Sequence, residues 1–184
     1  MQATWHLVSR TEKDAYREIH TQILVWLFGW KVIGDIPRDQ KKYIIIAAPH
    51  TSNWDFVIGV TVRGIVGFKS KFLGKVSLFK PPFGWFFRWL GGYPVDRSKR
   101  TKLVDQVIEI FNQHEEFVIA MAPEGTRGNV NEWRTGFYYI AHGAGIPIVR
   151  SKIDIGHKYV QFFEPFWTTG SIEVDLPKIK EAFL

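Results

Sequence analysis

"IIIAAPHTSNWDF", residues 44–56, changes character abruptly: five apolar residues lead into Pro49, and a histidine, three small polar residues, a tryptophan and an aspartate follow. "FVIAMAPEGTRGN", residues 117–129, has the same arrangement of an apolar run, Ala-Pro and a charged turn containing glycine. Continuous apolar runs of this length are typical of central strands that are covered on both faces. We therefore predict two neighbouring buried strands, each followed by a loop of ionisable residues.

The rest of the sequence alternates between strand-like and helix-like segments. Strands are expected at residues 43–48, 71–78, 117–121, 146–153 and 158–166. Helices are expected at residues 54–68, 83–90, 99–113, 133–142 and 177–182. This order predicts an α/β fold, a single domain with a largely parallel central sheet flanked by helices. Chemistry in such sheets gathers at the carboxyl ends of the strands, where both loops would lie.

The composition is that of a folded domain. A length of 184 residues suits one domain, and 46% hydrophobic with 23% charged residues is typical of a globular protein. Because cysteine is absent, disulfides, thiolate nucleophiles and cysteine-based metal sites are excluded. Residues 1–20 show no secretory signal pattern, so we expect a cytoplasmic protein.

The first 40 residues differ from the rest, and we expect an N-terminal amphipathic helical segment at 1–40 and a separate domain at 41–184. Residues 23–30 form an apolar run of about eight residues, fewer than the roughly 20 that a membrane-spanning helix needs. This segment would pack on the sheet as a helix, or lie in a membrane interface with its tryptophans and Lys31 at headgroup depth. Both interpretations remain open.

The positive charge is concentrated in one block. The chain has a net charge of +6, but residues 63–102 hold ten Lys/Arg and one acidic residue, so this block carries +9 and the rest −3. The block also holds nine aromatic residues. Three interpretations fit: an anionic lipid surface with an apolar layer beneath it, a nucleic-acid surface, and a solvated basic face whose aromatic residues belong to the core.

His50 and Asp55 are the first candidates for chemistry. Five positions correspond to about 140° of helical rotation, so the two side chains can meet only if His50 lies in the loop and Asp55 in the first turn of the helix. A carboxylate on one ring nitrogen would then fix the tautomer and leave the other nitrogen as a general base. The same pattern also fits a loop histidine and a helix-start acid without a catalytic role. No third ligand is spaced nearby, so we expect no metal.

Two further segments carry anion-binding residue types. In "EGTR", residues 124–127, an arginine fork fits phosphate oxygens and the glycine lets backbone N–H groups approach an anion. "GGYPVDRSKR", residues 91–100, ends the basic block with Arg97 beside Asp96. Each segment taken alone is also typical of a solvated turn.

Taken in order, these segments resemble the motifs of a known family. "PHTSNWD" fits an H-x-x-x-x-D motif, "GYPVDR" a second motif, "APEGTR" a third, and "GIPIV" at 145–149 loosely a fourth. From about residue 43 to 149 the chain resembles the glycerolipid acyltransferases of the 1-acylglycerol-3-phosphate acyltransferase type. Residues 71–92, between the motifs, are similar to the middle segment of that family. The resemblance makes residues 41–184 the acyltransferase catalytic domain.

The resemblance also implies a reaction and its residues. A fatty acyl group would pass from acyl-CoA or acyl-carrier protein to a hydroxyl of a phosphate-bearing (lyso)glycerolipid acceptor, without an acyl-enzyme, a cofactor, a metal or nucleic acid. The protein would associate peripherally with a membrane surface. The roles would be as follows: His50 the general base, Asp55 its orienting partner, Lys75, Arg97 and Arg127 the cations that hold the acceptor's phosphate, and Glu124, Gly125 and Thr126 the residues that shape the acceptor pocket.

Three positions depart from the family pattern. Pro49 replaces the usual Asn before the histidine, Ala122 replaces Phe, and Arg150 stands where the fourth motif usually continues with Pro, which suggests a place for Arg150 near the acceptor or acyl side. Two other functions compete with acyl transfer. One is a non-enzymatic basic interfacial or nucleic-acid-binding module in which His50 and Asp55 are structural. The other is a hydrolase that passes the acyl group to water.

Overall fold

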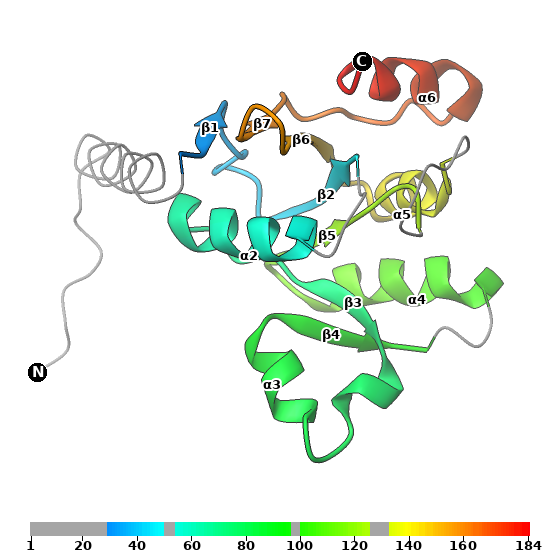
Figure 1. Ribbon diagram of the computed structural model, residues 1–184. Helices are drawn as coiled ribbons and strands as arrows, with labels where there is room; N and C mark the ends of the chain where they lie inside the picture. Colours follow the sequence, from blue (N-terminus) through cyan, green and yellow to red (C-terminus); the bar gives the residue numbers. More distant parts are fainter. Residues whose placement is uncertain (1–28, 50–53, 97–99, 126–132) are drawn as a thin grey trace, which may run out of the picture.

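The computed structural model of the chain describes residues 29–49, 54–96, 100–125 and 133–184, and its centre is a five-stranded sheet (Figure 1). The strand order is β1-β7-β6-β2-β5. All neighbouring pairs are parallel except β6 and β7, which are antiparallel, so the prediction of a largely parallel sheet is confirmed. The strands are β1 (Lys31–Ile33), β2 (Lys42–Ala48), β5 (Phe117–Met121), β6 (Ile148–Asp154) and β7 (Tyr159–Phe162).

Strand β2 lies between β5 and β6 and is buried on both faces. Tyr43 and Ile45 belong to one hydrophobic cluster and Ile44 and Ile46 to another, as the alternation of side chains along a strand requires. A strand covered on both faces accounts for the continuous apolar run in the sequence. The register places Ile46 opposite Met121 of β5, so the two predicted neighbouring strands are neighbours.

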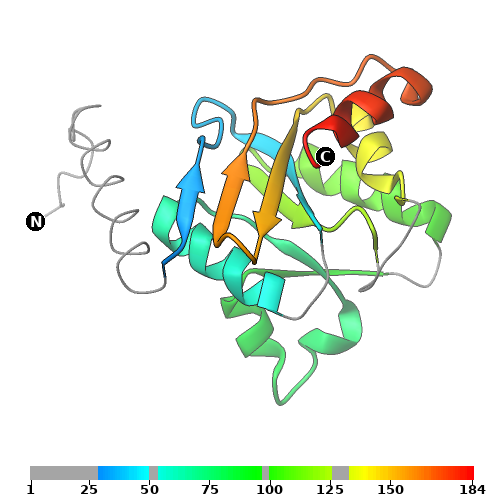
Figure 2. The same ribbon diagram turned by 45° about the horizontal axis from the view of Figure 1, so that its top comes forward.

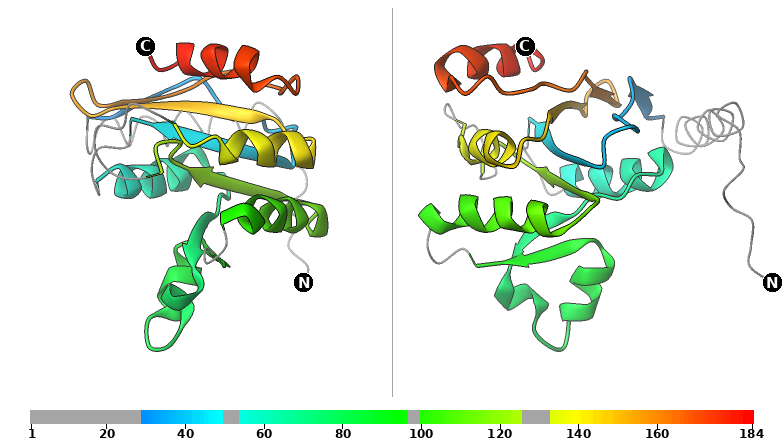
Figure 3. Two further views of the ribbon diagram at one scale, coloured as in Figure 1. Left: turned by 90° about the vertical axis from the view of Figure 1, so that its right-hand side faces the viewer. Right: turned by 180° about the vertical axis from the view of Figure 1, so that it is seen from behind.

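Helices cover both faces of the sheet (Figures 2 and 3). One face packs against α2, through Val62 and Val66. The other face packs against residues of three helices, which include Val107, Phe137 and Ile179. The helices are α2 (Trp54–Val66), α4 (Arg100–Gln113), α5 (Gly136–Ala144) and α6 (Ile172–Glu181).

The last helix, α6, is longer than the expected helix at 177–182, and Pro177 lies inside it. Asp175, which is fully buried, ties α6 to the rest of the domain. The Tyr138 hydroxyl on α5 donates to its carboxylate at 2.9 Å, and the Thr169 backbone N–H donates at 2.6 Å. These hydrogen bonds satisfy the buried carboxylate, which would otherwise be costly to bury.

A second, two-stranded parallel sheet projects from the edge of the main sheet (Figure 1). Its link to the main sheet is Lys71, whose N–H donates to Val118 at 2.7 Å and whose carbonyl accepts from Ala120 at 2.8 Å. We call residues 72–95 the α3 lobe. Its elements are β3 (Phe72–Lys75), the 3₁₀ helix η1 (Val76–Phe79), α3 (Gly84–Trp89) and β4 (Gly92–Val95).

Three further elements differ from the sequence predictions. The strand expected at 71–78 ends at Lys75, because the chain turns into η1 and brings Phe79 back into the lobe. Strands β4 and β1 were not expected, and β1 lies in the segment that was expected to be helical. The rest of that segment, residues 1–28, lies outside the described residues. Within the described part of the chain, no helix has the length and apolar character needed to cross a membrane.

Candidate active site

The strands that precede the three motifs run in the same direction. Strand β2 is parallel to β5, Lys71 bridges to Ile119 of β5 in parallel, and β3 is parallel to β4. The carboxyl ends of β2, β5 and β4 therefore point to the same side of the molecule, which is the side where α/β proteins place their chemistry. In the sequence, these ends lead into His50, Glu124 and Arg97. His50, Arg97, Thr126 and Arg127 lie outside the described residues, so their roles stay predictions.

Asp55 lies in the first turn of α2, as predicted, and is only 4% exposed. The N-terminal end of a helix carries partial positive charge, which favours a carboxylate at this position. A buried carboxylate is rare unless it has partners, and Asp55 has them. Its side chain also lines an apolar cavity that reaches the ends of β2 and β5. Asp55 therefore combines burial with access to a binding space.

This cavity lies between α2 and the sheet and has a volume of about 220 Å³. The cavity exists because some of the side chains that face α2 are small. Along β2 the residues on this face become smaller toward the carboxyl end, from Tyr43 and Ile45 to Ala47, and Ala120 and Ala122 line the same space from β5 and beyond it. Small side chains where the strands end leave room beneath α2. The resulting space is mostly apolar, with the Asp55 carboxylate at the end where α2 begins.

The turn after β5 holds Glu124, which is buried, and Gly125, whose φ is +67°. Arg134 crosses directly over Gly125: a Cβ on this glycine would lie 2.6 Å from the Arg134 Nε. The backbone N–H of Arg134 also donates to the Pro123 carbonyl at 2.7 Å. Gly125 is therefore required both for its left-handed backbone and for the close approach of a guanidinium.

Sequence reasoning missed Arg134 as a site residue. A signal for it was present, since a second arginine follows Arg127 by seven positions at the start of an expected helix. The structure places this cation against the "APEG" turn.

Lys75 ends β3 and is exposed. Its register partner is Val95, which directly precedes Asp96 and Arg97 of the second motif. The predicted phosphate ligand Lys75 therefore lies beside the strand that leads into the predicted ligand Arg97.

Arg150 does not belong to the cavity. It lies on β6 opposite Ile46, and its guanidinium donates to the Glu164 carbonyl at 3.1 Å and packs over the rings of Phe163 and Phe166. Burial lowers the pKa of this guanidinium below its ordinary value. The cavity is lined instead by Ser151, the next residue, whose side chain points to the opposite face. Arg150 therefore does not line the space under α2, and its place near the acceptor or acyl side stays a prediction.

Among the described residues, no group of three or more His, Asp or Glu side chains could hold a metal ion.

Comparison with known proteins identifies the family. Residues 30–151 match the Acyltransferase family. The 1-acyl-sn-glycerol-3-phosphate acyltransferase of Haemophilus influenzae is 31% identical over 154 residues, which are 79% of this chain and 62% of the relative. The protein of the same name from Saccharomyces cerevisiae is 33% identical over 146 residues, covering 71% of this chain and 44% of the relative. The Streptococcus pneumoniae protein of that name is 29% identical over 141 residues, covering 68% and 50%.

A solved structure has the same fold. The crystal structure of the 1-acyl-sn-glycerophosphate (LPA) acyltransferase PlsC from Thermotoga maritima superimposes with a TM-score of 0.60 at 22% identity, over 97% of this chain and 81% of that chain. The present chain spans between 44% and 62% of the length of the curated relatives it matches. The family match covers most of the chain and includes β2, the α3 lobe and β5. The chain belongs to the Acyltransferase family.

Proposed function

We propose that this protein transfers a fatty acyl group from a thioester, acyl-CoA or acyl-carrier protein, to a hydroxyl of a phosphate-bearing lysoglycerolipid. The observation that carries the proposal is the apolar cavity that Asp55 lines, beside the ends of the neighbouring strands β2 and β5. An apolar space next to ionisable groups suits a substrate with a hydrocarbon chain and a reacting polar end. The names of the relatives agree with this substrate class.

In the proposed reaction, His50 accepts the proton of the acceptor hydroxyl while the hydroxyl oxygen attacks the thioester carbonyl carbon. The C–S bond then breaks, the acyl group becomes an ester of the acceptor, and the leaving thiolate takes up the proton from His50. Asp55 orients the imidazole and stabilises its charged form. One direct step needs no nucleophilic side chain, in agreement with a sequence that has no cysteine.

The acceptor's phosphate is held by cations in this proposal. Lys75, Arg97 and Arg127 supply them, and Glu124, Gly125 and Thr126 shape the pocket. Arginine forks bind phosphate oxygens in pairs, and each charged hydrogen bond contributes about 1.5–3 kcal/mol. The reaction requires no cofactor besides the acyl donor.

The decisive experiment is a panel of lysophospholipid and glycerol phosphate acceptors, each paired with a phosphate-free counterpart. Acyl-CoA and acyl-carrier protein thioesters serve as donors, thiol release gives the rate, and mass spectrometry identifies the lipid product. We expect thiol release that depends on an acceptor with phosphate. Thiol release that needs no acceptor would identify a hydrolase. Equal use of phosphate-free acceptors would refute the phosphate site.

The role of His50 is tested by His50→Ala, with His142→Ala as the matched control. His142 is an exposed histidine at the end of α5 that contacts Thr168, away from the cavity. Loss of a general base costs on the order of 10²- to 10⁴-fold in kcat, so only His50→Ala should lose activity to this extent. Comparable activity of the two variants would remove His50 from the mechanism.

A further inference from the structure

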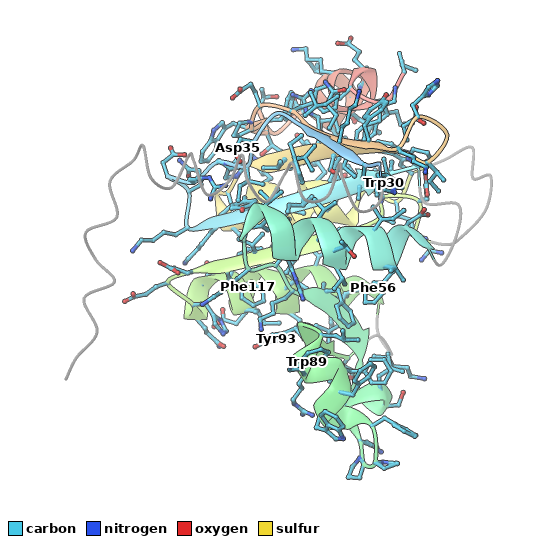
Figure 4. All side chains as sticks on the ribbon, turned by 60° about the vertical axis from the view of Figure 1, so that its left-hand side comes forward. Trp30, Asp35, Phe56, Trp89, Tyr93 and Phe117 are labelled. Atoms are coloured by element: carbon cyan, nitrogen blue, oxygen red, sulfur yellow. The ribbon has the colours of Figure 1, made fainter. Side chains whose placement is uncertain are left out.

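The α3 lobe exposes an unusual amount of aromatic surface. Trp85 is 69% exposed, Trp89 73% and Phe83 65%. The rings of Phe86 and Trp89 are stacked with centroids 6.1 Å apart, and Trp85 meets Phe86 at 6.0 Å, so these side chains form one continuous surface. Figure 4 shows Trp89 on the α3 lobe, which projects away from the main sheet. A contiguous apolar patch of this kind marks an interaction site.

The interior of the lobe is well packed, so the exposure is not a result of poor folding. Phe79 is buried, and three glycines surround it: a Cβ on Gly74, Gly84 or Gly92 would collide with the ring or backbone of Phe79. The Arg88 guanidinium donates to the Phe79 carbonyl at 3.0 Å and lies over its ring. The outer aromatic residues are therefore presented by a rigid support.

The lobe is also fixed to the main domain. The Arg63 side chain, from α2, donates to the carbonyls of Ser70 and Leu90, both at 2.9 Å. These two carbonyls lie just before β3 and just after α3. The orientation of the aromatic surface is therefore set by α2, which also carries Asp55.

The charge of the lobe has one sign. Residues 72–95 contain three Lys/Arg and no acidic residue, and Lys69 and Lys71 directly precede them. On the lobe itself, Lys75, Lys80 and Arg88 are exposed. Exposed aromatic rings beside cations match the chemistry of a bilayer surface with anionic headgroups.

We propose that the outer surface of the α3 lobe docks on an anionic lipid bilayer. Trp85, Trp89 and Phe83 enter the interface, and Lys80 contacts headgroup phosphates. Tryptophan favours this depth because its ring is apolar and its N–H still reaches water. The inference rests in part on the proposed function, since a lipid acceptor would reach the active site from the bilayer.

Two other partners fit the surface less well. Single-stranded nucleic acid binds in grooves where bases stack on aromatic rings, but this surface projects outward and includes the exposed aliphatic residues Val76 and Leu78. A second copy of the chain would have to bring another lobe with only positive charges against this one, and like charges oppose that contact. An anionic bilayer provides both an apolar layer and opposite charge.

The lobe adjoins the proposed active site at its base. Phe72, the first residue of β3, contacts Phe56 of α2 with ring centroids 5.2 Å apart, and Phe56 follows Asp55 directly. Both phenylalanines line the cavity. A bilayer held by the lobe would therefore lie near one wall of the cavity that we propose for the acyl chain.

The chain has no cysteine, so single-cysteine variants can carry one label at one place. Trp85→Cys and Trp167→Cys of the full chain are labelled with a polarity-sensitive fluorophore. Trp167 is a matched control because it is 55% exposed but lies in the segment between β7 and α6, at the opposite end of the molecule from the lobe (Figure 1). Vesicles of phosphatidylcholine with phosphatidylglycerol should shift the emission at position 85 to shorter wavelength and leave position 167 unchanged. If the chain sediments with vesicles while the label at 85 stays in water, another segment binds the membrane and the proposal fails.

Unlabelled variants test the energetics. The double variant Trp85→Ser/Trp89→Ser should weaken partitioning to these vesicles by at least roughly tenfold, and Lys80→Glu should weaken it by about tenfold at low salt. Trp167→Ser should bind as the unchanged chain does. Unaltered partitioning of the double variant to the vesicles would overturn the proposal. It would also be overturned if the double variant kept its vesicle binding but lost dimerisation or RNA binding.

The test separates this proposal from the proposed function. Vesicle binding requires no acyl donor, so it can be measured whether or not acyl transfer occurs. If both proposals hold, the double variant keeps its kcat/KM for a water-soluble glycerol phosphate acceptor and loses it for acceptors embedded in vesicles. An equal loss for both acceptors would show that the lobe serves the site itself and not the membrane.

Discussion

Gly59 controls the size of the cavity under α2, and this makes the acyl-chain assignment testable. Gly59 lies one helical turn after Asp55, on the same face of α2, and lines the cavity. A Cβ at this position would meet nothing within 4 Å. Gly59→Leu should therefore fold without a clash and fill part of a space of about 220 Å³.

The expected magnitude follows from the carbon atoms displaced. A leucine side chain takes the room of about four carbons, and each methylene excluded from an apolar site costs about 0.8 kcal/mol. The preference for long over short acyl donors should then fall by about 3 kcal/mol, a factor of about 10² in relative kcat/KM. Replacing a helical glycine should also stabilise α2 by about 0.5–1 kcal/mol, so a loss of long-chain activity would not reflect unfolding.

The matched control is Gly64→Leu. Gly64 also lies in α2 and its Cβ would also meet nothing within 4 Å, but it does not line the cavity. The assay is competition between acyl-CoA donors of increasing length, with products separated by mass, alongside urea denaturation of both variants. Both should be somewhat more stable than the unchanged chain, and only Gly59→Leu should prefer shorter donors. The same chain-length profile in both variants would mean that the acyl chain binds elsewhere.

Three further predictions concern the site and its support. Gly125→Ala should cost about 1–2 kcal/mol in urea denaturation, because φ is +67° and Arg134 occupies the space of a Cβ, whereas Gly136→Ala should be tolerated. Arg134→Gln should raise the KM of phosphate-bearing acceptors about tenfold and leave the KM of the donor unchanged in steady-state kinetics. Burial raises the pKa of Asp175, but its hydrogen bonds outweigh burial and hold the pKa below the ordinary value, so the stability it provides is lost as the pH falls below about 4. Tyr138→Phe should cost about 1.5–3 kcal/mol at pH 7 and move acid unfolding to higher pH.

Each of these predictions has an outcome that contradicts it. Equal stability of Gly125→Ala and Gly136→Ala would mean that Arg134 moves aside freely. An acceptor KM that is unchanged in Arg134→Gln would mean that this arginine only stabilises the turn and does not bind the acceptor. A Tyr138→Phe variant whose acid unfolding coincides with that of the unchanged chain would show that the hydrogen bond to Asp175 does not set the carboxyl pKa.

The central sheet could be predicted because its residues carry the information locally. The apolar runs at 44–48 and 117–121 are too continuous for half-exposed strands, and the structure pairs them in parallel. Strand β4 could not be predicted in this way. "GYPV" has a glycine and a proline, which read as a loop, and it becomes a strand only because the lobe closes around Phe79.

The side-chain direction of Arg150 could have been predicted from β6 alone, but the sequence analysis placed Arg150 by its position after the fourth motif. Successive side chains of a strand point to opposite faces, so Val149 and Ser151 share the α2 face and Arg150 must point away from it. The alternation along β6 therefore predicts the side-chain direction of Arg150 better than its position in a motif does. The cavity follows from the same alternation, since Ala47, Ala120 and Ala122 are the residues on the α2 face where β2 and β5 end.

Helix α2 connects these separate features. Its first turn carries Asp55, Gly59 leaves room for the cavity, and Phe56 contacts Phe72 at the base of the α3 lobe. Its Arg63 side chain donates to the carbonyl of Ser70, just before the lobe, and to that of Leu90 inside it. The opposite face of the sheet is packed differently, because residues of α4, α5 and α6 cover it with large buried side chains. If the lobe rests on a bilayer, the same helix that orients it also forms a wall of the cavity, so a lipid substrate has only a short path from membrane to site. Substitution of Arg63 should then lower both the affinity for vesicles and the rate of acyl transfer. Two unrelated surfaces would not produce this coupling.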